Sequence, residues 1–172
     1  MTPMVISKNH SAGVTSAKWH PTDSNIFASG SYDEVVFIWD KRNMNAPLIS
    51  IPTGGGVWRI KWYLFKTVNK DFELLLTANM QGGCKLYQFF VDEKEIEYDE
   101  FSTVVVKDHQ IYENIKLDVS LSDQSNVNTQ LAYGVSLLSC EEKDEDKSLI
   151  LNIASCSFYD NLLQLWKIKV PL

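Results

Sequence analysis

The sequence predicts an all-β protein made of about three repeated four-stranded sheets. A first observation is a repeated strand, since VTSAKW at Val14–Trp19 returns as VWRIKW at Val57–Trp62, an offset of 43 residues. A second is a recurring phrase in which an aspartate precedes a tryptophan by six positions, at Asp33–Trp39 and at Asp160–Trp166. Apolar and polar residues alternate in short runs, and helical periodicity is weak. Units of roughly 40 to 45 residues with four short strands are typical of the blades of a β-propeller.

The first unit covers approximately residues 8–52. Alternating apolar positions that end in Lys-Trp predict its first strand, and each later strand follows a turn rich in small or polar residues. We predict strands at 14–19, 26–31, 35–39 and 48–51.

The second unit covers approximately residues 53–106 and begins with a glycine run, Gly54-Gly55-Gly56. An acidic turn within 92–100 precedes its last strand. We predict strands at 57–62, 74–78, 85–90 and 102–106.

The third unit covers approximately residues 107–172. Its polar stretch 110–130 and its acidic segment 141–147 fit no strand of the period, so we interpret both as inserted surface loops. We predict strands at 131–138, 149–155 and 162–169.

The polar residues of these units resemble the WD-repeat family. In that family a complete blade has a histidine before the first strand, a serine or threonine on the second, an aspartate in the next turn and a tryptophan on the third. Together they form a hydrogen-bonded tetrad. The resemblance implies two tetrads here: His10, Ser29 (or Ser31), Asp33 and Trp39 in the first unit, and His109, Ser155 (or Ser157), Asp160 and Trp166 in the third.

The tetrad supplies donors to an aspartate that a tight turn partly dehydrates. In the middle unit, glycines at 54–56 and 82–83 replace the histidine and the aspartate, and Tyr87 replaces the tryptophan. We expect this unit to hold its turn through glycine conformation instead.

Three units are only part of a propeller. Rings have about four to eight blades, and seven blades of this period need roughly 300 residues, whereas the chain has 172. The third unit also ends after its third strand, so its outer strand has to come from elsewhere. We interpret the chain as the C-terminal part of a longer, about seven-bladed propeller, or as a truncated one.

Composition excludes several classes of protein. The net charge is −6 and lysine and arginine do not cluster, which argues against a nucleic-acid partner. No apolar run is long enough to cross a bilayer, and the N-terminus lacks the features of a secretory signal, so we expect a cytoplasmic protein. Cys84, Cys140 and Cys156 form no CxxC pair, and zinc, nucleotide and phosphate-binding motifs are missing. We expect reduced thiols, no metal and no organic cofactor.

Three longer stretches narrow the resemblance. They are SGSYDEVVFIWDKRNMNAPL at 29–48, GGGVWRIKW at 54–62 and ASCSFYDNLLQLWK at 154–167. Together they resemble the diphthine methyl-ester hydrolase family, also called diphthine methyltransferase, which consists of WD-repeat proteins of the diphthamide pathway. The pair Asp108-His109 and the later LAYG at 131–134 are similar to the last blade of that family.

This resemblance implies a reaction. Members of the family remove the methyl ester from over-methylated diphthine, a modified histidine of elongation factor 2, and release methanol. The freed carboxylate is then amidated by the next enzyme. The implied partners are elongation factor 2 as substrate and other proteins of the pathway.

Ester hydrolysis requires a base or an activated nucleophile, and donors for the oxyanion. His109 with Asp108 and with Ser157 or Asp160 has these ingredients, and His109, Asp108 and Ser157 are our candidate catalytic group. The competing interpretation makes His109 and a serine parts of the tetrad, as at His10, where we expect no catalysis.

Trp58, Arg59 and Tyr159 are candidates for substrate binding. Arg59 could pair with a carboxyl group or orient the ester carbonyl, and Trp58 could stack on the trimethylammonium group of diphthine. Tyr159 belongs to a turn with one aromatic residue more than the first unit has. The alternatives are that Trp58 packs inside the blade and that Arg59 makes an internal salt bridge. A different function, a non-catalytic WD-repeat adaptor, remains open.

Overall fold

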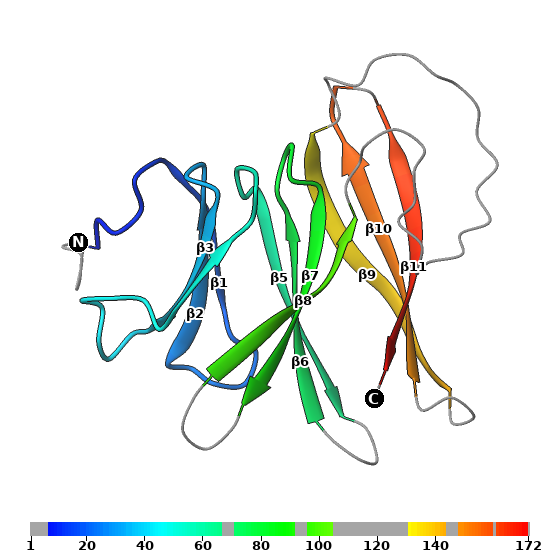
Figure 1. Cartoon of the computed structure of the whole chain (residues 1–172), viewed down its shortest axis with the longest axis horizontal. Coiled ribbons are helices and arrows are strands. Elements are labelled where there is room, and N and C mark those ends of the chain that lie inside the picture. Colours follow the sequence, from blue (N-terminus) through cyan, green and yellow to red (C-terminus); the bar gives the residue numbers. More distant parts are fainter. Residues whose placement is uncertain are drawn as a thin grey trace.

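The computed structural model describes residues 7–66, 71–91, 96–104, 131–143, 148–159 and 161–171. These residues form eleven strands in three antiparallel sheets, and none of them is helical. Figure 1 shows the sheets side by side in chain order, with the N-terminal sheet at one end and the C-terminal sheet at the other. The predicted all-β architecture of a partial propeller is confirmed, and each sheet lies within one predicted unit.

The first sheet consists of β1 (Val14–Trp19), β2 (Ile26–Ser31), β3 (Val35–Asp40) and β4 (Ile49–Pro52), paired in chain order. Its first two strands have the predicted bounds. Strand β3 ends one residue later than predicted, and β4 is shifted by one residue at both ends. Short-range alternation and turn residues were sufficient here because each strand pairs with its neighbour in the sequence.

The second sheet consists of β5 (Arg59–Lys66), β6 (Asp71–Ala78), β7 (Cys84–Val91) and β8 (Ile96–Val104), again in chain order. Strand β8 begins inside the acidic segment 92–100, which the sequence had assigned to a turn. The acidic residues of β8 lie on the outermost strand, which pairs on one side only. Edge strands in natural sheets commonly carry charged residues.

The third sheet has the order β11-β10-β9, with β9 (Ala132–Lys143), β10 (Ser148–Ser157) and β11 (Leu163–Pro171). The prediction of an inserted loop at 141–147 was wrong at its start, because β9 continues to Lys143 and pairs Glu141 with Ile150 and Glu142 with Leu149. Both glutamates are exposed, so pairing their backbones buries no charge. The predicted insertion 110–130 lies outside the described residues.

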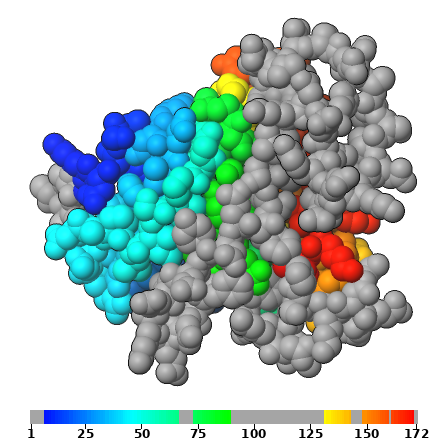
Figure 2. Space-filling view, viewed as in Figure 1, coloured from blue at the N-terminus to red at the C-terminus, as the bar shows by residue number. Residues whose placement is uncertain are grey.

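Two apolar layers join the sheets. Residues of alternating positions face a neighbouring sheet, as the period of two in a strand requires. The layer between the first and second sheets contains Ala28, Val36, Ile38, Ile51, Val57, Ile60, Leu75, Tyr87 and Phe89. The layer between the second and third contains Leu74, Leu76, Ala78, Cys84, Leu86, Ala132, Val135, Leu149, Leu151, Ile153, Ile168 and Val170. The space-filling view shows the same order, with the first sheet in blue and cyan and the second in green (Figure 2).

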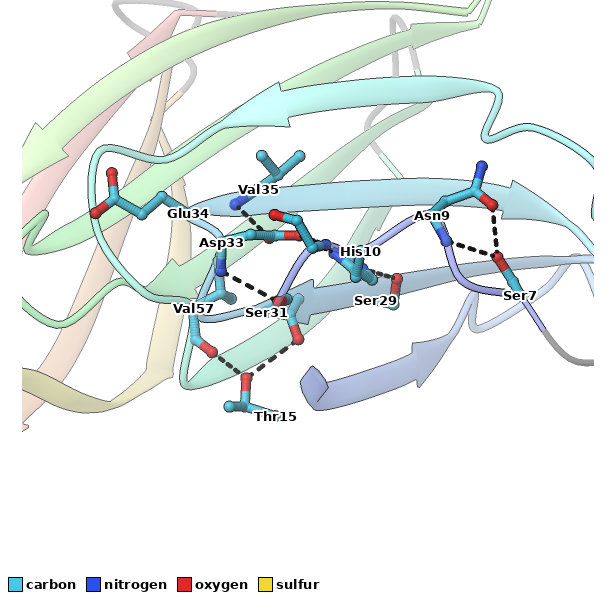
Figure 3. Close-up of polar contacts among 12 residues, drawn as sticks. Ser7, Asn9, His10, Thr15, Ser29, Ser31, Asp33, Glu34, Val35 and Val57 are labelled. Carbon is cyan, nitrogen blue, oxygen red and sulfur yellow. Dashed lines mark hydrogen bonds and ion pairs between the residues drawn. The ribbon is translucent and has the colours of Figure 1, made fainter. Parts of the chain in front are cut away.

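Polar contacts connect neighbouring sheets near their inner strands. The Thr15 hydroxyl donates to the Val57 carbonyl (Figure 3). The Lys61 ammonium donates to Ser136 Oγ at 2.8 Å, and the Leu137 amide donates to the Tyr63 hydroxyl at 2.9 Å. Strands β1, β5 and β9 therefore lie next to one another. Among the described residues, no helix is long and apolar enough to cross a membrane.

Candidate functional site

The first sheet carries the four polar side chains that the sequence grouped as a tetrad. His10 Nδ1 lies 2.9 Å from Asp33 Oδ2, and His10 Nε2 lies 2.7 Å from Ser29 Oγ. The Trp39 indole donates to the same Ser29 Oγ at 2.8 Å. Figure 3 shows His10 between Ser29, which lies on β2, and Asp33, which lies in the β2–β3 turn. The structure therefore brings these four side chains into one chain of hydrogen bonds.

The donors in this chain determine its proton arrangement. The Trp39 indole only donates, so Ser29 Oγ accepts from it and can donate its own proton to His10 Nε2. His10 Nδ1–H then donates to Asp33. Burial opposes ionisation of Asp33, but the bonds from His10 and from the Ser11 amide outweigh it and lower the pKa of Asp33 below its usual value. The aspartate is thus stabilised as a carboxylate inside a turn.

A serine, a histidine and an aspartate in this order have the connectivity of a hydrolytic triad. Here the Trp39 indole occupies a lone pair of Ser29 Oγ, and the side chains of His10 and Asp33 are only 7% and 8% exposed. Asp33 also caps its own turn by accepting from the amides of Ser11 and Val35. This geometry favours a structural role for the three residues, as a clamp that holds the turn. It does not favour Ser29 as a nucleophile that meets a substrate.

The third sheet repeats part of this arrangement. The Trp166 indole donates to Ser155 Oγ at 2.7 Å, as Trp39 does to Ser29. Of the two serines that the sequence left open in each unit, the structure places Ser29 and Ser155 against the tryptophans. Asp108, His109 and Asp160 lie outside the described residues.

Ser157 was a candidate nucleophile. Its Oγ is buried and has no hydrogen-bond partner among the described residues. In the first sheet, Ser31 has the corresponding place at the end of the strand, and its Oγ accepts from the Asp33 amide. Ser157 follows Ser155 as Ser31 follows Ser29 in the sequence, so its position is suited to a turn cap as well as to chemistry.

The second sheet replaces the tetrad by close backbone packing. A Cβ added to Gly55 would lie less than 3.0 Å from the Asn79 carbonyl oxygen and from the Gly82 nitrogen. Thr53 Oγ1 donates to the carbonyl of Gly55 at 2.8 Å, and the Gly82 amide donates to Asn79 O at 2.7 Å. Only glycine fits this close approach, which accounts for the glycine runs.

Five aromatic side chains form a row across the three sheets, which we call the aromatic row: Tyr32, Trp58, Tyr133, Phe158 and Tyr159. Ring centroids are 5.9 Å apart for Tyr32 and Trp58 and 5.1 Å apart for Trp58 and Tyr133. Tyr133 continues to Phe158 at 6.4 Å and to Tyr159 at 6.1 Å. These spacings are those of edge-to-face aromatic contacts.

The row lies at one end of the sheets, because it joins the ends of β2 and β10 to the starts of β5 and β9. A Cβ on Gly56 would lie 3.0 Å from a ring carbon of Tyr32, so the glycine allows the chain to run close beside the row. Tyr32, Phe158 and Tyr159 are exposed. The result is an open aromatic surface built from all three blades.

Arg59 borders this surface. It is exposed, its guanidinium donates to the Trp58 carbonyl at 3.1 Å, and its Cζ lies 5.9 Å from the Trp58 ring. None of the ion pairs found among the described residues includes Arg59, so they do not support the alternative of an internal salt bridge. A guanidinium beside aromatic rings can receive a carboxylate or carbonyl oxygen.

Comparison with known proteins identifies the family to which the chain is similar. A family model described as "WD domain, G-beta repeat" matches residues 2–40. A protein named "Diphthine methyltransferase homolog" from Dictyostelium discoideum is 37% identical over 161 residues, 93% of this chain and 36% of that protein. "Diphthine methyltransferase" of Mus musculus is 28% identical, over 96% of this chain and 48% of its own length. "Diphthine methyltransferase" of Homo sapiens is 48% identical, over 46% of this chain and 17% of its own length.

The chain belongs to the diphthine methyltransferase family of WD-repeat proteins. It spans less than half the length of these three relatives. A shorter stretch, 31% of the chain, is 39% identical to the "GATOR2 complex protein WDR24" of Dictyostelium discoideum, as expected for a repeat that many proteins share.

In this member of the diphthine methyltransferase family, Tyr133 connects Trp58 to Tyr159, and Arg59 contacts Trp58. The sequence analysis did not select Tyr133. Tyr133 stands in the third unit where Trp58 stands in the second, before or at the start of the inner strand. Aligning the first strands of these units would have found it. Desolvation, and then a hydrogen bond with Tyr159, raise the pKa of Tyr133, so its hydroxyl stays protonated. The described residues contain no group of three or more side chains suited to a metal ion.

Proposed function

We propose that this chain acts in diphthamide biosynthesis, as a carboxyl methyl-ester hydrolase that converts the methyl ester of diphthine on elongation factor 2 into diphthine. Support comes from the relatives named diphthine methyltransferase, which align over nearly the whole chain. The hydrolytic direction of the reaction follows from the family resemblance. The proposed partner is elongation factor 2, and the proposed compartment is the cytoplasm, where that factor works.

The aromatic row with Arg59 at its edge is the observation that carries the proposal. Diphthine combines a trimethylammonium group with a carboxyl group on one side chain. The faces of Trp58 and Tyr133 suit the first group, since aromatic faces attract quaternary ammonium ions. Arg59 suits the ester carbonyl before hydrolysis and the carboxylate after it. In this proposal Trp58, Arg59 and Tyr159 bind the substrate.

The chemical step is attack of water on the ester carbonyl, collapse of the oxyanion and departure of methanol. A base has to take a proton from the water, and a donor has to stabilise the oxyanion. His109 with Asp108 remains our candidate base. Ser157 is the candidate nucleophile of a two-step route, in which its oxygen attacks the ester carbonyl, methanol leaves with the proton that the base took from the serine, and water then hydrolyses the acyl-enzyme to the carboxylate and free serine. Arg59 beside Trp58 and the protonated Tyr133 hydroxyl are our candidate donors at the aromatic row.

The test is the mass of elongation factor 2 that carries methylated diphthine, measured before and after incubation with the protein. We expect the change of a methyl ester into a carboxylic acid, together with methanol. Losing the Arg59 contact should lower kcat/KM roughly ten- to hundredfold in Arg59→Ala, since bonds to charged groups contribute about 1.5–3 kcal/mol. His109→Ala should abolish turnover if the histidine is the base.

Arg42→Ala is the matched control, because Arg42 is an exposed arginine that pairs with Asp40 in the first sheet, away from the row. It should turn over like the wild type. An unchanged mass, with the factor still bound, would instead identify a non-catalytic adaptor.

A further inference from the structure

Trp58 and Tyr133, at the centre of the aromatic row, lie where neighbouring sheets meet. Trp58 precedes β5 of the second sheet and Tyr133 lies on β9 of the third, with ring centroids 5.1 Å apart and planes inclined by 80°. Tyr32 reaches Trp58 from the first sheet, 5.9 Å away and inclined by 63°. Both partners of each contact belong to described sheets, so this part of the row does not depend on the outer faces of the first and third sheets.

The faces of these rings are available to a ligand. Neither contact is parallel, so no ring covers the face of its neighbour completely, and Trp58 and Tyr133 are only half-buried. The face of an aromatic ring carries partial negative charge and attracts a quaternary ammonium ion that lies within about 6 Å of the ring centroid. Tryptophan is the best ring type for this contact.

Two cations accompany the rings. Arg59 and Lys61 are two positions apart on β5, so their side chains leave the same face of the strand. Arg59 donates to the Trp58 carbonyl at 3.1 Å. Lys61 donates to Ser136 Oγ at 2.8 Å. Both acceptors are neutral, and the ion pairs in the described part of the chain include neither cation. An anionic group of a ligand would therefore complete this site.

These rings and cations discriminate among ligands by charge. A quaternary ammonium ion alone gains the contact with the rings, but Arg59 and Lys61 repel it. A carboxylate alone pairs with Arg59 and gains little from the rings. A betaine, in which a quaternary ammonium group and a carboxylate are close neighbours, gains both contacts and has no net charge to be repelled.

We propose that this site binds a betaine more tightly than the corresponding methyl ester. The biological meaning rests on the function proposed above, in which the ester is the substrate and the betaine is the product, so that the product inhibits turnover. The ester offers Arg59 a neutral carbonyl oxygen, whereas the carboxylate offers two oxygens for a bidentate pair and cancels the positive charge. We expect a dissociation constant lower by at least about tenfold, the effect of one charged hydrogen bond. Release of the product then limits the turnover rate.

Ligand-observed NMR on the 172-residue chain tests the preference. The probes are glycine betaine, its methyl ester and tetramethylammonium, which carry the same methylated nitrogen. Saturation of the aromatic protons of the protein should transfer to the N-methyl protons of each probe, and titration should give the tighter binding for betaine. The methoxy signal of the ester shows that it stays intact during the measurement. Low ionic strength is needed, because salt screens an exposed arginine.

Three variants locate the preference. Arg59→Gln should remove it, so that betaine and the ester bind alike, because the charge is lost while hydrogen-bond donors remain. Arg42→Gln is the matched control: Arg42 is an exposed arginine that pairs with Asp40, and this variant should keep the full preference. Tyr133→Leu should weaken the binding of all three probes and leave the ratio of betaine to ester unchanged, because it removes a ring and no charge. Circular dichroism verifies that each variant is folded.

Equal or weaker binding of betaine by the wild type overturns the proposal. So does the absence of saturation transfer to every probe, or a preference that survives in Arg59→Gln. These outcomes are separate from the test of catalysis. An unchanged mass of elongation factor 2 together with the betaine preference would reject the proposed reaction and support the betaine site. Turnover without the preference would overturn the betaine site and keep the reaction.

Discussion

Replacing Ser29 by alanine tests the clamp of the first blade most directly. Ser29 Oγ accepts from the Trp39 indole at 2.8 Å and lies 2.7 Å from His10 Nε2. Ser29→Ala removes both bonds with little change of volume. Trp39 is 2% exposed, so its indole N–H is left buried without an acceptor.

The magnitude follows from these losses. The lost bond with His10 contributes about 1 kcal/mol, and the buried Trp39 donor that is left without a partner costs about 1–3 kcal/mol. We expect Ser29→Ala to lower the free energy of unfolding by about 2–4 kcal/mol. A domain of this kind has roughly 5–15 kcal/mol in total, so the loss is large enough to measure.

Urea unfolding followed by tryptophan fluorescence, with linear extrapolation, measures this free energy. Ser24→Ala is the matched control: Ser24 is exposed between β1 and β2, and its loss should cost less than about 0.5 kcal/mol. Trp39→Phe removes the donor, so the double variant with Ser29→Ala should cost at least about 1 kcal/mol less than the sum of the single variants. Strictly additive costs, or a Ser29→Ala protein as stable as Ser24→Ala, would refute the clamp.

Three further predictions concern other parts of the chain. Folding lowers the pKa of Asp33. The contribution of Asp33 to the free energy of unfolding is therefore complete above the unfolded pKa of about 3.9 and is lost as the pH falls through the folded pKa. Asp33→Asn should remove this part of the acid sensitivity, as measured by urea titrations between about pH 2 and 6. Gly55→Ala should destabilise the protein by more than Gly54→Ala does, because a Cβ at Gly55 meets backbone whereas Gly54, at φ 70°, has open space and costs only about 1–2 kcal/mol. Cys156 should react with a thiol reagent in the folded protein while Cys84 does not, since Cys156 is exposed and burial raises the pKa of Cys84 to about 12; equal rates would contradict the assigned burial.

Local sequence predicted most of the fold. Strands β1 and β2 have the predicted bounds, because alternation and turn residues act within a few positions. Predictions were poorer at β8 and at the end of β9, where acidic residues suggested loops. Charge alone does not separate a loop from an exposed strand, since Glu141 and Glu142 lie on β9 and still keep their carboxylates in water.

Part of the candidate site was also predictable. The spacing of His10, Asp33 and Trp39 indicated the hydrogen-bonded tetrad. The glycine run before Trp58 and Arg59 singled out these two residues. Tyr133 was missed, because its importance comes from its distance of 5.1 Å to Trp58 and not from any local motif.

By itself the sequence determined the number of blades, most strands and the presence of the turn clamps, because hydrogen bonding between adjacent strands and side-chain alternation are short-range effects. Tertiary structure decided that Ser29 and Ser155 accept from the tryptophans and that five aromatic rings join across three sheets. These features depend on which surfaces of separate sheets meet. That is set by packing between residues far apart in the chain, which no single stretch of sequence records.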